Sequence, residues 1–131
     1  MKIGFSFYGI TYGLGGKFEV ERDFKHCWPN VKKMLIDPFV SKGHQYEIYF
    51  STYHFSNVDK FVEFKKVVNP DKILLSEIKR SDPFTSKGSS FVNFIHDESV
   101  DVIVFCRNDL HFSKIIANEN IDFSKFNFLF K

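Results

Sequence analysis

The chain has few cysteines, few prolines and no long apolar run. Its two cysteines, Cys27 and Cys106, cannot form a disulfide framework and show no CxxC or Cys/His spacing, so we expect a reducing compartment and no structural zinc. The longest apolar run, residues 102–106, is far shorter than the ~20 residues that span a bilayer. Met1 is not followed by an apolar leader with a cleavage site, which predicts a cytoplasmic protein, in a host cytoplasm if the source is viral.

Neither sign of charge dominates. Lys and Arg total 18 against 16 Asp and Glu, a formal charge of +2, which is too balanced to predict binding to nucleic acid or to anionic lipid. Arginine is scarce, because all but Arg22, Arg80 and Arg107 of the basic residues are lysines. The abundance of Lys and of 18 Phe is typical of an AT-rich genome, so the few arginines gain weight as candidate functional residues.

The sequence does contain enough apolar residues to form one hydrophobic core. With 131 residues, of which 44% are hydrophobic and 26% charged, the chain predicts a single globular domain over residues 1–131. Strand patterning occurs at residues 2–8, 46–51, 72–76, 102–106 and 126–130.

Helical spacing separates these runs. One helix is expected over residues 23–37, kinked or restarted at Pro29 and ended by Pro38, and a second after Asn57 as N-cap. A third follows the polar loop at residues 81–90, capped by Ser89 or Ser90. Alternating strands and helices predict an α/β, Rossmann-like three-layer domain with a mostly parallel sheet of about five strands and helices on both faces. Ligands bind such sheets at the carboxyl ends of strands.

A glycine-rich stretch, residues 9–16, follows the first strand. It is not a Walker A loop or a dinucleotide fingerprint, because Thr11 and Phe18 occupy positions where those motifs need other residues. Two interpretations stay open: a flexible surface loop, or a looser loop that borders a nucleotide.

The most informative stretch runs from residue 101 to 112, where a buried strand leads directly into polar side chains. If the extended conformation continues, Arg107, Asp109 and His111 share one face. Asp109 and His111 could then hold a divalent ion that bridges two phosphates, with Arg107 adding charge-assisted contacts. Arg22, at the start of the first helix, could add to the helix dipole in holding a diphosphate. The alternatives are a polar turn in which Asp109 caps the next segment, and a solvated Arg22 paired with a neighbouring acid.

Several segments together resemble a known family. The order is Arg22 ahead of a helix that reads Cys-Trp-Pro-Asn from Cys27, a strand that ends in Thr52 and Tyr53, and a later strand that ends in Arg-Asn-Asp-Leu from Arg107. This resembles nucleotide-sugar glycosyltransferases of the GT-A-like kind, found in capsule and surface-glycan clusters and in large DNA viruses. The resemblance implies Mn²⁺ or Mg²⁺ and the sugar-nucleotide diphosphate at Asp109, with Arg107 beside them and Arg22 near the nucleotide.

The expected function is therefore a glycosyltransferase, or its N-terminal donor-binding half, that binds a nucleoside diphosphate sugar through a divalent metal. An acceptor side would come from another chain or from further residues. One alternative is a non-catalytic α/β binding or assembly module, a truncated transferase that forms a homo-oligomer. Another is a different nucleotide- or phosphate-dependent enzyme on the same fold.

Overall fold

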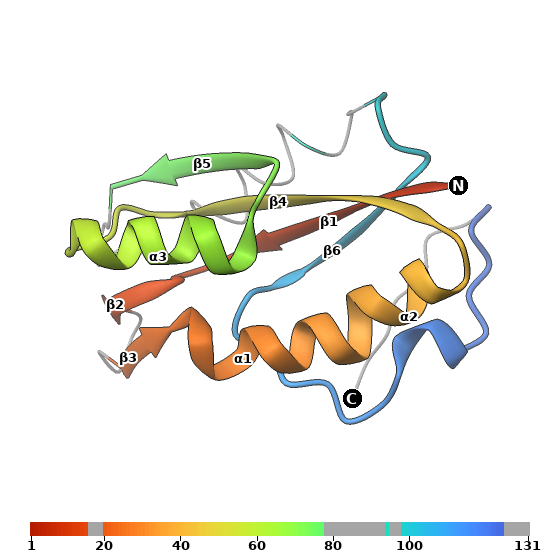
Figure 1. Ribbon diagram of the computed structural model, residues 1–131, viewed down its shortest axis with the longest axis horizontal. Coiled ribbons are helices and arrows are strands. Elements are labelled where there is room, and N and C mark those ends of the chain that lie inside the picture. Colours follow the sequence, from red (N-terminus) through yellow and green to blue (C-terminus); the bar gives the residue numbers. More distant parts are fainter. Residues whose placement is uncertain (16–19, 78–93, 95–97, 125–131) are drawn as a thin grey trace.

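In the described part of the protein, four parallel strands form the central sheet. The computed structural model describes residues 1–15, 20–77, 94 and 98–124. Across the sheet the strands are β5 (Lys72–Ser76), β4 (Gln45–Tyr53), β1 (Lys2–Tyr8) and β6 (Val102–Arg107) (Figure 1). Numbered along the chain, this order is 3-2-1-4, which is the order of the first four strands of a Rossmann-like sheet. The predicted α/β, Rossmann-like fold is confirmed.

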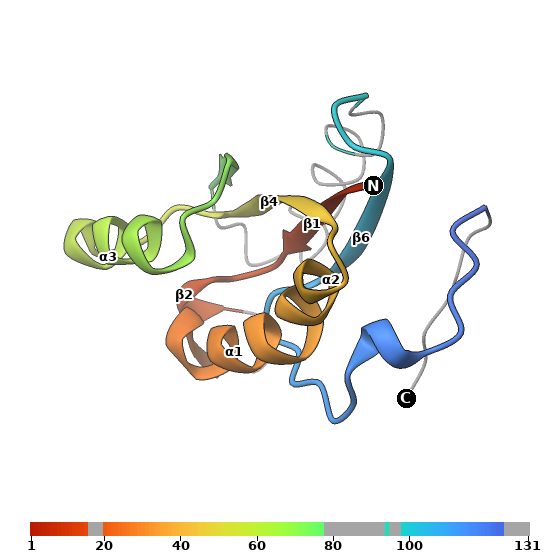
Figure 2. The same cartoon turned by 45° about the vertical axis from the view of Figure 1, so that its right-hand side comes forward.

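The described helices cover one face of this sheet. They are α1 (Phe24–Val31), the π-helical turn η1 (Lys32–Ile36), α2 (Asp37–Ser41) and α3 (Val58–Val68), all on the same side in Figures 1 and 2. Aromatic rings join them to the strands: the Phe7 ring lies 5.8 Å from that of Trp28 and 5.1 Å from that of Phe50, which in turn lies 5.0 Å from Phe64. Burying such rings is the main source of stability in this layer.

The opposite face of the sheet has smaller residues along its centre. Ser6 and Ser51 are fully buried there, and the Tyr49 ring packs 4.9 Å from that of Phe94. Phe94 belongs to the third helix predicted from the sequence, whose other residues lie outside the described part of the chain. The polar loop expected at residues 81–90 and the strand expected at 126–130 also lie outside it.

Two prolines do not act as predicted. Pro29 does not restart the first helix, because α1 runs through it without a break and Pro29 lies on the exposed side, where water can bond the carbonyl group that loses its partner. Pro38 does not end the helical segment either. In the π-helical turn before it the Asp37 N–H bonds to the Lys32 carbonyl, so Pro38 stands in the first turn of α2, where no N–H is needed.

The predicted N-cap of α3 is confirmed. The Asn57 side chain accepts a hydrogen bond from the Lys60 N–H at 3.2 Å, and Asn69 ends the helix in the left-handed conformation at φ +50°. A short 3₁₀ turn, η2 (Ile116–Asn118), follows β6. Among the described helices, none has the length and apolar character needed to cross a bilayer.

Candidate functional site

The strand order reverses between β1 and β6. β1 continues toward α1 on one face, whereas β6 lies on the other side of β1 from β4 and β5. In sheets of this kind the crevice outside the carboxyl ends of the two strands is where ligands bind. Tyr8 and Arg107 are paired at this end of the two strands, so the residues that follow them meet at one edge.

A β-hairpin stands where the sequence left open a flexible surface loop or a looser loop that borders a nucleotide. β2 (Tyr12–Gly15) pairs antiparallel with β3 (Val20–Asp23), and Gly9 enters the hairpin with φ +116°, a conformation that favours glycine. Asp23 then caps α1 by accepting a hydrogen bond from the Lys25 N–H at 3.0 Å. The hairpin thereby brings Arg22, the residue before this cap, to the carboxyl edge of the sheet.

Two arginines share one carboxylate at this edge. The Arg107 guanidinium donates two hydrogen bonds to Asp109, from Nε to Oδ1 at 2.9 Å and from Nη2 to Oδ2 at 2.6 Å. Arg22 Nε approaches the same Oδ2 at 3.6 Å. These three groups, two cations and one anion, carry one unit of excess positive charge. The Asp109 side chain is 22% exposed and that of Arg107 is 54% exposed, so solvent and ligands can reach the group.

A neutral layer of hydrogen bonds lies behind these charges. We call Gly9, Thr11, Thr52 and Asn108 the buried polar layer. The Asn108 amide donates to the Gly9 carbonyl at 3.1 Å and to Thr11 Oγ1 at 2.9 Å. The Thr11 hydroxyl donates to Thr52 Oγ1 at 2.7 Å, and the Thr52 hydroxyl donates to the Gly9 carbonyl at 2.7 Å. The layer ties the ends of β1, β4 and β6 together.

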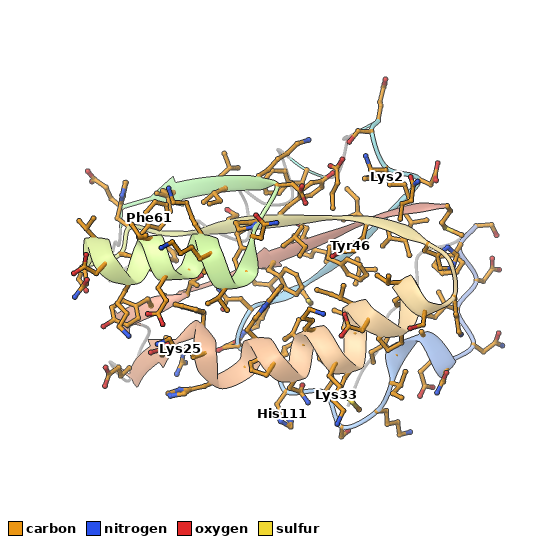
Figure 3. All side chains as sticks on the ribbon, viewed as in Figure 1. Lys2, Lys25, Lys33, Tyr46, Phe61 and His111 are labelled. Carbon is orange, nitrogen blue, oxygen red and sulfur yellow. The ribbon has the colours of Figure 1, made fainter. Side chains whose placement is uncertain are left out.

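The three predicted site residues Arg22, Arg107 and Asp109 are therefore brought together, and His111 is not shown to join them. β6 ends at Arg107 and the chain turns at residues 108–109, so the extended conformation that would have put Arg107, Asp109 and His111 on one face does not continue. His111 is exposed and projects outward at the lower edge of Figure 3. Within residues 1–15, 20–77, 94 and 98–124, no three His, Cys, Asp or Glu side chains form a group that could hold a metal.

The cysteines near the site are protonated thiols. Burial raises the pKa of Cys106 to about 12. Burial is the main cause that raises the pKa of Cys27, and the nearby negative charge of Asp109 raises it further. The hydrogen bonds to Asp109 raise the pKa of Arg107, which stays charged under all ordinary conditions. Neither thiol therefore adds a negative charge to the two guanidinium groups and the carboxylate that meet at this edge.

Sequence reasoning missed the residues that support the site. It gave no role to Thr11, and Asn30, Thr52 and Asn108 entered only as parts of sequence motifs. The supporting contacts of Asn30 were not foreseen: its side chain donates to the Phe112 carbonyl at 3.0 Å and accepts from the Phe112 N–H at 2.6 Å. The sequence offers one sign of such residues, which is a polar side chain within an otherwise apolar strand or helix face. Such a position predicts a buried hydrogen bond, but it does not identify the residue that forms the other half of the bond.

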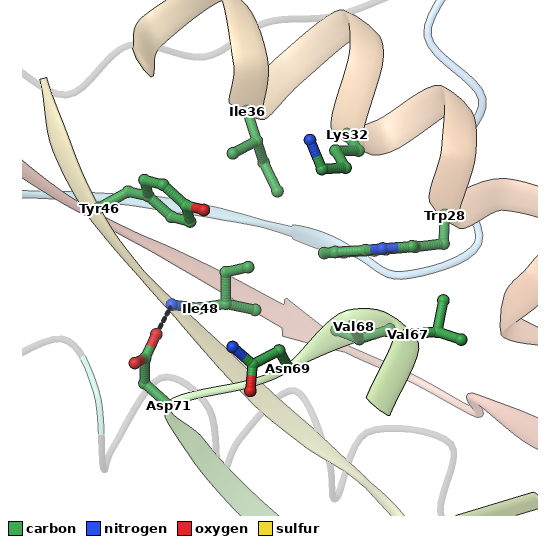
Figure 4. Close-up of a pocket in the computed structure, with 9 residues that line it drawn as sticks. All are labelled: Trp28, Lys32, Ile36, Tyr46, Ile48, Val67, Val68, Asn69 and Asp71. Atoms are coloured by element: carbon green, nitrogen blue, oxygen red, sulfur yellow. Dashed lines mark hydrogen bonds between the residues drawn. The ribbon is translucent and has the colours of Figure 1, made fainter. Parts of the chain in front are cut away.

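A separate recess lies between the helices, away from the carboxyl edge. It has a volume of about 310 Å³ and opens between α1 with η1 on one side and the end of α3 on the other (Figure 4). Its lining includes Trp28, Tyr46 and Ile48, and none of the predicted site residues. At the base of the recess the Asp71 carboxylate accepts a hydrogen bond from the Ile48 N–H at 2.7 Å.

No protein-family model, no curated protein and no solved structure matches this chain. The resemblance to glycosyltransferases therefore stays a prediction from the residues quoted above.

Proposed function

We propose that this protein binds the diphosphate of a nucleoside diphosphate sugar at the carboxyl edge of β1 and β6, as the donor-binding part of a glycosyltransferase. The observation that carries the proposal is the pair Arg22 and Arg107, called here the arginine pair, converging on the single carboxylate of Asp109. Guanidinium groups suit phosphate oxygens because their N–H groups form parallel charge-assisted hydrogen bonds. The excess positive charge and the place in the fold both favour an anionic ligand.

A divalent ion does not fit this donor set well. Both oxygens of Asp109 already face guanidinium groups, so a Mn²⁺ or Mg²⁺ ion at this carboxylate would have to sit beside two positive charges. The metal site at Asp109 and His111 stays a prediction from the sequence. In the proposed function the arginine pair binds the diphosphate directly.

Binding of this kind has a chemical use in glycosyl transfer. When the bond between the sugar carbon and the diphosphate oxygen breaks, negative charge develops on the departing nucleoside diphosphate. Guanidinium groups held at that position stabilise this charge and favour departure. The proposal covers the donor side of the reaction, and the acceptor side would be supplied by groups beyond those described above.

Titration of the purified protein tests the proposal. UDP-sugars, GDP-sugars and inorganic pyrophosphate are added in the presence of a chelator or of Mn²⁺, and thermal unfolding is followed. A ligand at 100 times its dissociation constant stabilises by about 2.7 kcal/mol. We expect such a shift in the chelator, because the arginine pair needs no metal.

Matched variants locate the binding site. Arg22→Gln and Arg107→Gln should each weaken binding about tenfold or more, because each removes charge-assisted hydrogen bonds. Lys2→Gln, at the amino end of the same sheet, removes one positive charge and should leave binding unchanged. A shift that needs Mn²⁺ and is lost in Asp109→Ala would replace our proposal by the metal site, and no shift with any sugar nucleotide would refute both. If the protein binds a sugar nucleotide but transfers the sugar to no acceptor, the result would favour the alternative function, a non-catalytic binding module.

A further inference from the structure

Asn108 lies between the two residues that meet at the candidate site, yet it faces away from them. Its backbone N–H donates to the Tyr8 carbonyl at 2.9 Å, and its side-chain amide donates to the Gly9 carbonyl and to Thr11 Oγ1. Three hydrogen bonds thus attach the residue that follows β6 to the end of β1 and the residues just after it. The neighbours on either side, Arg107 and Asp109, are directed to the outer surface.

The orientation of this amide is fixed by its partners. The Gly9 carbonyl is an acceptor only, so the amide nitrogen and not the amide oxygen must face it. Thr11 and Thr52 are 2% and 0% exposed, and their hydroxyl hydrogens follow one direction, from Thr11 to Thr52 and from Thr52 to Gly9. Because each of these donor hydrogens, two on the Asn108 amide and one on each threonine hydroxyl, has its own acceptor, the layer favours a single arrangement.

A second asparagine holds the other end of the same segment. Asn30 of α1 bonds both the N–H and the carbonyl group of Phe112. Asp109 therefore lies on a short segment that is attached at Asn108 to β1 and at Phe112 to the first helix. The distance between Asp109 and Arg22, which precedes that helix, depends on both attachments.

We propose that Asn108 is the positioning residue of the anion site. It does not contact the ligand. It fixes the turn after β6 so that Arg107 and Asp109 project toward Arg22, and the arginine pair is ordered before a ligand arrives. Preorganised charged groups bind more tightly because less conformational freedom is lost on binding. The effect on affinity rests on the proposed function, whereas the effect on the Arg107 side chain does not.

The arginine side chains provide a direct measurement. The sequence has three arginines, so an NMR spectrum of the Nε–H groups has three signals, and Arg107→Gln identifies the one from Arg107. In the wild type this signal should be protected from solvent exchange by the bond to Asp109. We expect Asn108→Ala to lose that protection and to weaken pyrophosphate binding about tenfold. Thr11→Val removes one of the two side-chain acceptors and should give an intermediate effect if Asn108→Ala does not fold.

Asn57→Ala is the matched control. It removes the cap of α3 and lowers stability without touching the carboxyl edge of β1 and β6, so both the Arg107 signal and the affinity should be unchanged. If Asn108→Ala or Thr11→Val lowers the melting temperature but changes neither the protection of the Arg107 signal nor the affinity for pyrophosphate, the role of Asn108 is only structural. That result would overturn the inference. If the wild type binds no pyrophosphate, the proposed function fails, and the Arg107 signal still decides whether Asn108 positions this side chain.

Discussion

The two ends of β1 both carry ion pairs, but they differ in the cations that contact the carboxylate. At the amino end Lys2 Nζ pairs with Glu47, whose other oxygen accepts a hydrogen bond from the Tyr49 hydroxyl at 2.6 Å. The positive charge of Lys72 also acts on this carboxylate. At the carboxyl end the two guanidinium groups of the arginine pair meet the single carboxylate of Asp109.

In the function we propose, this difference separates an ion pair that only joins two strands from a charged group that binds an anionic ligand. Partly exposed salt bridges are common and contribute little to stability, so their presence alone does not mark a site. Excess charge of one sign, located where the strand order reverses, is a more specific signal. The carboxyl end has both features, and it also has the buried polar layer that holds the charged residues in place.

The largest effect is expected from breaking the buried polar layer at the carboxyl end. Thr52→Val removes the acceptor for Thr11 and the donor to the Gly9 carbonyl, leaving buried groups without partners. We expect a loss of about 2–3 kcal/mol of unfolding free energy, measured by urea denaturation. The neighbouring Ser51→Ala is the control, because the Ser51 hydroxyl is buried with no hydrogen-bond partner among the described residues and its loss should be nearly neutral. Equal losses in the two variants would contradict the role given to the layer.

A smaller difference is expected between glycines at the two ends. Gly9 and Gly43 both have positive φ, +116° and +90°, so alanine at either position costs about 1 kcal/mol in backbone strain. At Gly9 the new methyl group would also lie 3.2 Å from the Asn108 amide oxygen, whereas at Gly43 it meets nothing within 4 Å. Gly9→Ala should therefore lose roughly 1 kcal/mol more than Gly43→Ala and should also weaken pyrophosphate binding. If Gly43→Ala is the more damaging change, Asn108 is not held as tightly as we infer.

The smallest effect is expected from the ion pair at the amino end. The hydrogen bond from Lys2, with that from Tyr49, lowers the pKa of Glu47 below its ordinary value. The ionised Glu47 carboxylate therefore stabilises the fold fully at a pH above its pKa in the unfolded chain, which is about 4.3. This stabilisation is lost as the pH falls through the lower pKa that Glu47 has in the folded protein. Glu47→Gln should remove this part of the acid dependence, cost about 0.5 kcal/mol at pH 7, and leave ligand binding unchanged. Altered ligand binding in Glu47→Gln would remove the contrast between the two ends.

The sequence predicted the sheet well because its strands are short, apolar and separated by helical spacing. β1 and β5 have the predicted bounds, and the Asn57 cap of α3 lies where local preference puts it. The two prolines were misjudged because their effect depends on solvent exposure and on a π-helical turn, which residue spacing does not reveal. The hairpin was missed because its strands are only four residues long and their sequences, YGLG and VERD, show little strand patterning.

The candidate site was predictable in part for a similar reason. Arg22, Arg107 and Asp109 could be named because the residues after parallel strands meet at one edge. Their pairing could not be predicted, because a carboxylate beside an arginine and a histidine is equally typical of a metal ligand. The support from Thr11, Thr52 and Asn30 depends on contacts between residues far apart in the sequence, and polar residues of this kind carry no local sign of their partners.

The central claim is that the arginine pair binds an anionic ligand and that the Asp109 carboxylate competes with this ligand for the two guanidinium groups. Asp109→Asn tests this most directly, because the amide keeps an acceptor for Arg107 and removes the negative charge. In a chelator we predict that pyrophosphate and UDP bind this variant more tightly than the wild type, by roughly 1 kcal/mol or about fivefold in affinity. Weaker binding by Asp109→Asn, or binding that needs Mn²⁺ in the wild type and disappears in the variant, would contradict the account and identify Asp109 as a metal ligand.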